Sequence, residues 1–360
     1  MRVRTQGCAR VFLLEHSPFK GVAMSSPMTL PNTAPSGIAS DRQSSVDARN
    51  DRLFRWLVAG CGVLVLSLLL GAALSMAWGG RQAFATFGFH FFTSTDWDIN
   101  AGQFGALVPI LGTLVTALIA ILIAVPISFG IALFLTDVAP QWMRGPVGTA
   151  IELLAGIPSI IYGMWGFFIF VPIMSNFIQP WLINHLGDGT DDAGKPTGLG
   201  LSVFSGAPIG VGILTAGIVL AVMIIPFISS VMREVFLTVP SRLKESAYAL
   251  GSTRWEVLWD IVLPYTRTAV IGGIFLGLGR ALGETMAVTF VIGNSHDFST
   301  SLIMPGTSIA ATIANEFNEA GSDLHRSALI ALAFVLFLVT FVVLAIAKLM
   351  LRQLAKREGK

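Results

Sequence analysis

The stretch Glu245-Ser246-Ala247 is followed by Gly251 and then by Ile261-Val262-Leu263-Pro264, and it lies between two long apolar segments. Three residues separate Ala247 from Gly251, and nine separate Gly251 from Ile261. The order is a charged helix start, small residues, a glycine that can end the helix, and a Leu-Pro pair at the return to apolar sequence. A loop that only connects two membrane helices needs no such order. We therefore interpret the segment as a docking element.

The composition is typical of an integral membrane protein. The chain is 54% hydrophobic and 12% charged, whereas soluble domains carry about 25% charged residues. Its two cysteines are too few for a disulfide framework or a metal site. No G-x-x-x-x-G-K sequence followed by Ser or Thr is present, so any ATP that drives the protein binds to another chain. We expect no enzyme activity, catalytic residue, cofactor, metal or nucleic-acid partner.

Six stretches are long and apolar enough to cross a bilayer as helices, which takes about 20 residues each. They are roughly residues 53–78, 107–135, 147–174, 209–232, 268–292 and 327–349. The predicted fold is therefore all-α, with six transmembrane helices in a domain of residues 51–355. Residues 1–50 are rich in Ser, Pro and Arg without a sustained apolar period, which predicts a disordered cytoplasmic arm. Residues 356–360 are expected to form a cytoplasmic tail.

The distribution of Lys and Arg predicts the orientation of the chain, because cytoplasmic segments carry the excess. The arm through Arg55, the loop holding Arg144, the segment from Arg233 to Arg267 and the tail from Lys348 together carry nineteen. The other three loops carry three, alongside nine acidic residues. Both termini are therefore expected in the cytoplasm, together with the docking loop at about 233–267.

Two charged residues, Arg280 and Glu284, lie in the middle of the fifth predicted span. A charge at the bilayer centre costs about 2.5–3.5 kcal/mol on insertion scales, so such residues usually face a pathway or a partner. Their i, i+4 spacing places them on one helical face, close enough to pair, with Thr285 nearby. In one interpretation the pair only braces the helix bundle. In the other, the guanidinium offers its donors to a passing oxyanion, and Glu284 weakens that hold so that the anion is released.

Three stretches carry a resemblance to a known family: residues 152–163 (ELLAGIPSIIYG), the docking segment, and residues 279–288 (GRALGETMAV). The docking segment resembles the ATPase-docking loop of ABC-importer permeases, whose pattern is E-A-A, three residues, G, nine residues, I-x-L-P; here Ser246 replaces an alanine. With the other two stretches, residues about 50–355 resemble a permease subunit of the bacterial phosphate ABC importer, of the C type. The resemblance implies a type I ABC-importer permease fold in the bacterial inner membrane.

The resemblance also implies partners and a mechanism. A second permease of the A type, two cytoplasmic ATPase subunits and a periplasmic phosphate-binding protein would assemble with the chain in the lipid bilayer, and phosphate would cross by alternating access. The substrate pathway is expected at Arg280, Glu284 and Thr285. The small face of Ala247 and Gly251 is expected in a socket on the ATPase. The full set of residues expected to couple to the ATPase is Glu245, Ser246, Ala247, Gly251, Ile261, Leu263 and Pro264.

Two other functions fit parts of the sequence. The docking loop would serve an ABC importer for sulfate or molybdate equally well. Glu284 favours phosphate, because its carboxylate can accept a hydrogen bond from a protonated oxyanion and repels sulfate, which carries no proton at neutral pH. An ion-coupled secondary transporter could instead use Glu284 as a proton carrier. Against that function, the chain shows no convincing internal repeat of the kind that many secondary transporters have.

Overall fold

A computed structural model describes residues 39–189 and 198–357 of the chain, which divides into two units, residues 1–65 and residues 66–360. The helix α1 (Ala39–Gly79) accounts for the described residues of the first unit and continues into the second. It extends into the predicted disordered arm, because no Gly or Pro interrupts residues 39–50 and extending a formed helix costs little. Residues 1–38 of the predicted arm lie outside the described part, and the domain boundary at residue 50 stays a prediction.

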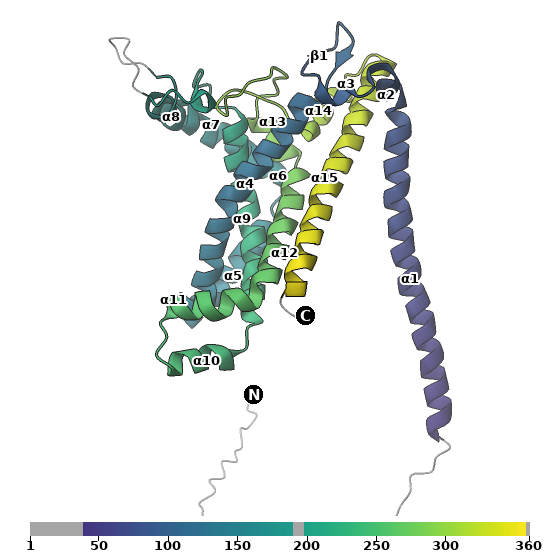
Figure 1. Ribbon diagram of the computed structural model, residues 1–360, viewed down its shortest axis with the longest axis vertical. Coiled ribbons are helices and arrows are strands. Elements are labelled where there is room, and N and C mark those ends of the chain that lie inside the picture. Colours follow the sequence, from purple (N-terminus) through teal and green to yellow (C-terminus); the bar gives the residue numbers. More distant parts are fainter. Residues whose placement is uncertain (1–38, 190–197, 358–360) are drawn as a thin grey trace, which may run out of the picture. The chain divides into compact units, whose positions relative to one another are not determined.

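Helices make up most of the second unit (Figure 1). After α1 come α2 (Arg81–Phe87), α3 (His90–Thr93), α4 (Leu107–Leu133), α5 (Gln141–Ala155), α6 (Ser159–Trp165), α7 (Val171–Ile173), α8 (Gln179–His185), α9 (Ile213–Leu237), α10 (Ser241–Ala249), α11 (Arg254–Val257), α12 (Leu263–Leu282), α13 (Met286–Val291), α14 (Ile309–Glu316) and α15 (Asp323–Arg357). π-helical segments extend or join several of these helices, at Phe134–Val138, Gly166–Phe170, Met174–Ile178 and Leu258–Val262, and a 3-10 turn spans Ser202–Phe204. The strands β1 (Trp97–Asp98) and β2 (Gln103–Phe104) pair as an antiparallel hairpin.

The predicted number of membrane spans is confirmed. Among the described residues, six helical stretches are long and apolar enough to cross a membrane: Asn50–Gly79, Leu107–Val138, Ser159–His185, Ile213–Leu237, Arg254–Leu282 and Asp323–Gln353. The bounds of the first, second, fourth and sixth spans agree with the predicted bounds to within a few residues. The bounds of the third and fifth spans differ from the prediction by more than that.

The predicted third span, residues 147–174, is wrong because α5 ends at Ala155 and a separate helical stretch begins at Ser159. The predicted fifth span, residues 268–292, is wrong because α12 ends at Leu282 and α13 begins only at Met286. The first interruption, Gly156-Ile157-Pro158, carries no charge, and the second, Gly283-Glu284-Thr285, is flanked by apolar residues on both sides. Hydropathy therefore predicts one continuous helix in each case, whereas the backbone forms two separate helices.

The core of the second unit is built on α4, α9 and α12, which pack against one another. Glycines bring α12 close to α9. A Cβ added at Gly277 would lie 2.6 Å from Ile228, and one added at Gly273 would lie 2.9 Å from Val231. These small residues of α12 therefore pack directly on α9. Small residues let membrane helices approach this closely.

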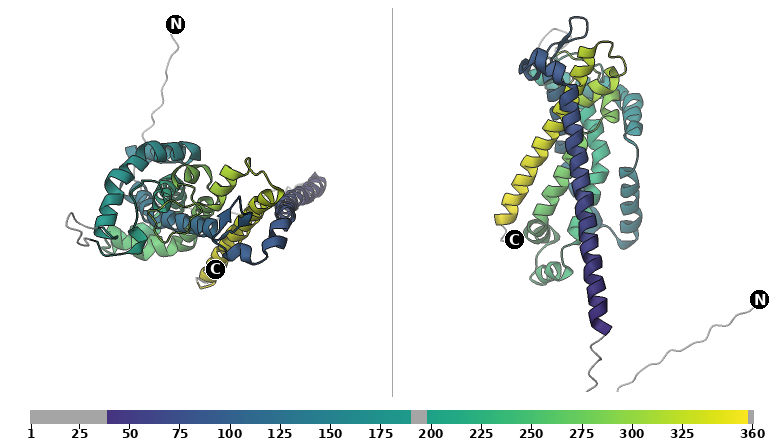
Figure 2. Two further views of the ribbon diagram at one scale, coloured as in Figure 1. Left: turned by 90° about the horizontal axis from the view of Figure 1, so that it is seen from above. Right: turned by 90° about the vertical axis from the view of Figure 1, so that its right-hand side faces the viewer.

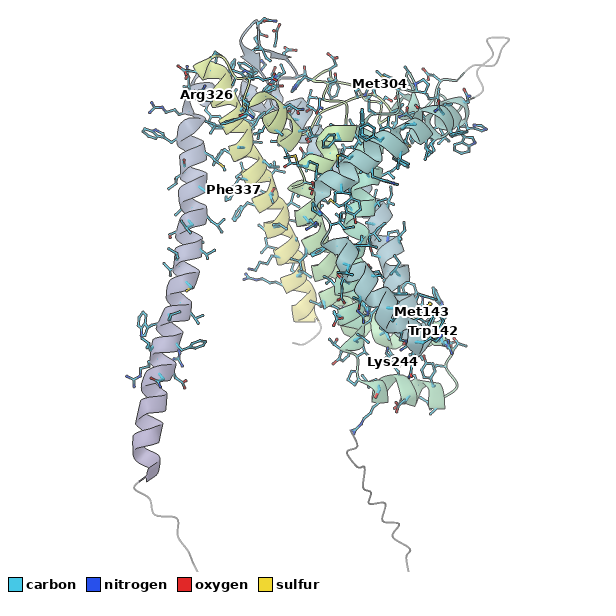
Figure 3. All side chains as sticks on the ribbon, turned by 180° about the vertical axis from the view of Figure 1, so that it is seen from behind. Trp142, Met143, Lys244, Met304, Arg326 and Phe337 are labelled. Carbon is cyan, nitrogen blue, oxygen red and sulfur yellow. The ribbon has the colours of Figure 1, made fainter. Side chains whose placement is uncertain are left out.

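The helix bundle of the second unit has two different ends. Figure 1 shows α10 and α11 at its lower end, which we call the docking end, and β1, α3 and α14 at its upper end, which we call the hairpin end. Figure 3 labels Lys244 and Trp142 at the docking end, and Met304 and Arg326 at the hairpin end. The predicted docking segment thus lies at the opposite end of the bundle from the β-hairpin.

At the hairpin end, the carboxylate of Glu316 joins four elements. It accepts a hydrogen bond from Trp97 at 3.0 Å, and its two oxygens lie 2.8 Å from His296 Nε2 and 2.9 Å from His325 Nε2. Burial opposes ionisation of Glu316, but these hydrogen bonds outweigh it and hold the pKa of the carboxyl below its ordinary value. Because these residues come from β1, the loop before α14, α14 and α15, the ionised carboxylate fixes the hairpin end.

Replacing Glu316 by Gln is expected to lower stability at pH 7 by about 1–3 kcal/mol, because hydrogen bonds to a buried charge are weakened. A carboxyl with a depressed folded-state pKa stabilises the fold above its unfolded pKa, near 4.3, and loses that contribution as pH falls through the folded value. The stability of the unaltered protein should therefore fall more steeply than that of the variant below about pH 4.3. Thermal unfolding of the purified protein across this pH range measures both effects.

The matched control is Glu319→Gln, which changes an exposed acid of the same loop region and should leave the unfolding temperature unchanged. Equal unfolding temperatures for Glu316→Gln and the unaltered protein at pH 7 would contradict the role assigned to this carboxylate.

Candidate functional site

Two interruptions of the helices line one cavity. Residues 156–158 separate α5 from α6, and residues 283–285 separate α12 from α13. The right-hand view of Figure 2 shows the first of these links as a coil joining two stacked helices. The cavity has a volume of about 670 Å³ and is lined by residues 155–159 together with Gly279, Arg280, Gly283 and Glu284. Two of the three stretches that carry the family resemblance thus meet in space.

Glycine and proline explain why the helices stop here. Pro158 has no amide hydrogen and disfavours helical backbone at the residue before it. Gly156 and Gly283 stand at the C-terminal ends of α5 and α12. Tyr162 spans the first interruption, because its hydroxyl donates a hydrogen bond to the Leu154 carbonyl at 3.0 Å. The interruption is therefore closed on one side by a side chain of α6.

The two helices that leave the cavity are packed backbone to backbone. A Cβ added at Gly163 of α6 would lie 2.8 Å from the Phe290 ring and 3.0 Å from the Ala287 Cα of α13. One added at Gly166 would lie 3.0 Å from Val219 and 3.1 Å from Val291. Contacts this short leave no room for a side chain at Gly163. The glycine therefore sets the distance between α6 and α13.

Arg280 lies in the last turn of α12 and faces an aromatic ring. Its guanidinium carbon is 5.7 Å from the centre of the Phe227 ring of α9, a distance at which a cation is attracted to the ring face. Among the described residues no carboxylate forms an ion pair with Arg280. The sequence analysis missed Phe227, since nothing in a single apolar helix shows which of its rings lies over a charge on another helix. The ring orients the guanidinium without neutralising it.

The predicted pairing of Arg280 with Glu284 on one helical face is wrong. That geometry needs a continuous helix, and α12 ends before Glu284. Glu284 instead accepts a hydrogen bond from the Ala287 amide at 3.3 Å and so caps the first turn of α13. It still lines the same cavity as Arg280. Thr285 precedes α13 and is not among the residues that line the cavity, and its carbonyl accepts a hydrogen bond from the Thr289 hydroxyl at 2.7 Å.

The docking segment has the local structure that its spacing predicts. Helix α10 ends at Ala249, and Gly251 follows with φ +93°, a conformation that favours glycine. The amides of Gly251 and Ser252 bond the carbonyls of Tyr248 and Ala247 at 3.0 and 3.1 Å, which is the Schellman pattern of a helix end. Ile261 lies in the π-helical segment before α12. Leu263 and Pro264 form the first turn of α12.

The exposure of the docking segment corrects one expectation. Glu245 and Ser246 are exposed, as a docking role requires, and Gly251 has open space around its Cα. Ala247, however, is only 7% exposed and belongs to the same hydrophobic core cluster as Val257 and Leu258. Its small side chain therefore anchors α10 to its own chain rather than entering a socket on a partner.

Known proteins resemble the chain over most of its length. Residues 124–356 match the family model for the binding-protein-dependent transport system inner membrane component. The chain is 64% identical over 317 residues to the phosphate transport system permease protein PstC of Xylella fastidiosa (strain 9a5c), which covers 87% of this chain and 94% of that protein. It is 57% identical over 308 residues to the protein of the same name from Pasteurella multocida (strain Pm70), with coverages of 86% and 93%.

One solved structure bears on the fold. A chain of the bacterial alginate ABC transporter, crystallised in complex with its alginate pentasaccharide-bound periplasmic protein, aligns with a TM-score of 0.53 at 18% identity. The alignment covers 85% of this chain and 98% of that chain. Together with the family match, this likeness confirms the predicted six-helix ABC-importer permease fold. The cytoplasmic position of the termini stays a prediction.

Gly163→Ala is expected to destabilise the protein by about 1–3 kcal/mol, because the added methyl group forces α6 away from α13. The matched control is Gly130→Ala in α4, where an added Cβ meets open space and a better helix former should change stability by about 1 kcal/mol or less, in the stabilising direction. Thermal unfolding in detergent measures both. If the two variants unfold at the same temperature, the close approach at Gly163 does not constrain the bundle.

Proposed function

Because the chain belongs to the family of binding-protein-dependent transport system inner membrane components, we propose that it is the permease subunit through which an ATP-driven importer carries inorganic phosphate. It is a multi-pass inner membrane protein and a transport component rather than an enzyme. Relatives at 64% and 57% identity that are named phosphate permeases support the substrate. The structural observation that carries the proposal is the Arg280 guanidinium at the cavity where two helices are interrupted.

Arg280 has the chemistry to receive a phosphate ion. A guanidinium presents its donors in a planar fork that matches two oxygens of a phosphate group. Since the Phe227 ring lies over the guanidinium and no described carboxylate pairs with it, the donors are available to an incoming anion. The residues lining the opposite wall include Gly156, which has no side chain, and the small residues Ala155 and Ser159. An anion at Arg280 would therefore meet the guanidinium on one wall and mostly small residues on the other.

Glu284 gives the cavity a means of selecting and releasing the anion. Its carboxylate lines the same cavity without pairing with Arg280, so it lowers the positive potential that the anion meets. A monoprotonated phosphate can donate its proton in a hydrogen bond to such a carboxylate, whereas sulfate at neutral pH has no proton to donate. This contrast favours phosphate over the sulfate and molybdate alternatives. Membership of the importer family favours ATP over an ion gradient as the driving force.

The partners follow from the same proposal. Two cytoplasmic ATPase subunits would dock on the inner face, one of them at the docking segment. A second permease of the A type would complete the pathway, and a periplasmic phosphate-binding protein would deliver the ion. The excess of Lys and Arg at residues 233–267 supports a cytoplasmic docking end. ATP binding would close the ATPase dimer and move α10, and the bundle would open the cavity alternately to each side.

The decisive experiment is uptake of labelled phosphate and labelled sulfate by cells that lack their own phosphate permease and express the chain with its partners. Phosphate uptake without sulfate uptake is the expected result. Sulfate uptake without phosphate uptake would overturn the proposed substrate. Phosphate uptake by the chain in the absence of any ATPase subunit would overturn the ATP-driven mechanism.

Arg280→Gln is expected to lower phosphate uptake at least about tenfold, because a hydrogen-bonded charge at the anion is replaced by a neutral amide. The assembled complex should remain intact, since Arg280 has no described ion-pair partner to leave unpaired. The control is Arg352→Gln, which removes an exposed charge near the end of α15 and should leave uptake unchanged. Normal phosphate uptake by the Arg280 variant would contradict the proposed anion-binding role and would favour the interpretation in which Arg280 only stabilises the helix bundle.

Gly251→Val is expected to uncouple ATP hydrolysis from phosphate uptake, because a β-branched residue at φ +93° costs about 1–2 kcal/mol and distorts the end of α10. The matched control is Gly251→Asn, since asparagine tolerates this conformation, and it should keep most of the coupling. Uptake and ATPase activity are measured on the same membrane preparation. Full coupling in the valine variant would refute the docking role of this turn.

A further inference from the structure

A partly buried ion pair holds the docking helix to the end of α4. Lys244 Nζ of α10 lies 3.0 Å from Asp137 Oδ1, and the two side chains are only 17% and 25% exposed. Asp137 belongs to the π-helical segment Phe134–Val138, which directly continues α4. Its second oxygen lies 3.2 Å from the Thr136 hydroxyl, which has a shorter contact of 3.0 Å with the Ala132 carbonyl. Lys244 is therefore the closest polar partner of this carboxylate among the described residues.

The same turn is also tied to α5. The Arg144 Nε donates a hydrogen bond to the Ala139 carbonyl at 2.8 Å, immediately after the π-helical segment. Arg144 lies in the first turn of α5, a helix that runs without interruption to Ala155 and then forms one wall of the Arg280 cavity. Figure 3 shows Lys244 at the same end of the bundle as Trp142 and Met143 of this first turn. A displacement of Lys244 therefore reaches the cavity wall through one ion pair, one hydrogen bond and one helix.

The opposite wall of the cavity is connected to the docking segment by the chain itself. After α10 and α11 the backbone continues into α12, which carries Arg280 in its last turn. A movement of the docking segment is thus passed directly to Arg280. The wall formed by residues 155–159 has no such direct connection, because two membrane spans, Ser159–His185 and Ile213–Leu237, separate α5 from the docking segment in the chain. The ion pair of Arg233 with Glu152, at 3.1 Å, joins α5 to α9 rather than to α10.

We propose that the Lys244–Asp137 ion pair is the link that makes the α5 wall of the cavity move with the docking helix, while α12 moves the Arg280 wall. This inference rests on the proposed function and deepens it, since it names the connection between ATPase docking and the substrate cavity. Lys244 and Asp137 are positioning residues, and neither lines the cavity.

The geometry separates this role from docking itself. Ala247 is buried against the core cluster of its own chain, and the capping box of Thr253 and Glu256 orders the start of α11. These contacts hold the docking segment in place without Lys244. Removal of the pair should therefore leave the ATPase bound and disconnect only one wall of the cavity.

The test uses the complete transporter in lipid vesicles and measures phosphate uptake and ATP hydrolysis in the same preparation. The single variants Asp137→Asn and Lys244→Met should lower the phosphate carried per ATP hydrolysed on the order of tenfold, the size of a typical coupling between two sites. The ATPase should still co-purify with both. The reversed pair, Asp137→Lys with Lys244→Asp, should restore most of the ratio, because the attraction rather than either side chain carries the link.

The matched control is Arg352→Gln, a charge-to-amide change at an exposed position near the end of α15, for which no contact with Lys244 or Asp137 is found among the described residues. It should leave the ratio unchanged. Three results would overturn the link: full coupling in the single variants, loss of the ATPase from them, or a reversed pair as uncoupled as the single changes. Absence of phosphate uptake by the unaltered transporter would instead contradict the proposed function.

Discussion

Inside a bilayer, backbone N–H and C=O groups have no water to bind, so a helix can stop there only against protein or a water-filled space. In this chain α5 and α12 stop at residues 156–158 and 283–285, and both interruptions line one cavity. The cavity also exposes the polar side chains of Arg280 and Glu284, which suits a water-filled space. Each interruption is supported because the other lies across the cavity from it. The close packing of α6 on α13 at Gly163 follows from the same requirement, since these helices restart side by side.

Hydropathy predicts six spans correctly in number, because the apolar length needed to cross a bilayer leaves a strong signal in sequence. It fails at the two interruptions. The residues around Pro158 are as apolar as a spanning helix, and the two charges near Gly283, Arg280 and Glu284, lie within an otherwise apolar stretch, so a hydropathy average does not divide either segment. Proline and glycine within a span are a weaker signal, since Pro126 and Pro226 lie inside α4 and α9 without ending either helix. Whether a helix stops depends on its neighbours.

The docking segment is predicted better than the cavity because its signals are local. The turn at Gly251, the start of α12 at Leu263-Pro264 and the exposure of Glu245 all depend on residues within a few positions. By contrast, the pairs Phe227 with Arg280 and Asp137 with Lys244 join residues that are far apart in the sequence. A single sequence carries no record of such contacts. The burial of Ala247 is of the same kind, because its partners in the core cluster come from several helices.

Arg280 is oriented by the Phe227 ring and not, as the sequence suggested, by Glu284. This difference changes how the cavity can bind an anion. If Arg280 were paired with a carboxylate, the ion pair would have to break before an anion could bind the N–H donors of the guanidinium. The free energy needed to break it would be required in every transport cycle. A ring face attracts the cation by about 0.5–2 kcal/mol and occupies none of its N–H groups. Glu284 can then act on the anion rather than on Arg280, from a position fixed by its bond to the Ala287 amide. Because this position depends on the break after α12, the interruption that opens the cavity also separates the two charges within it.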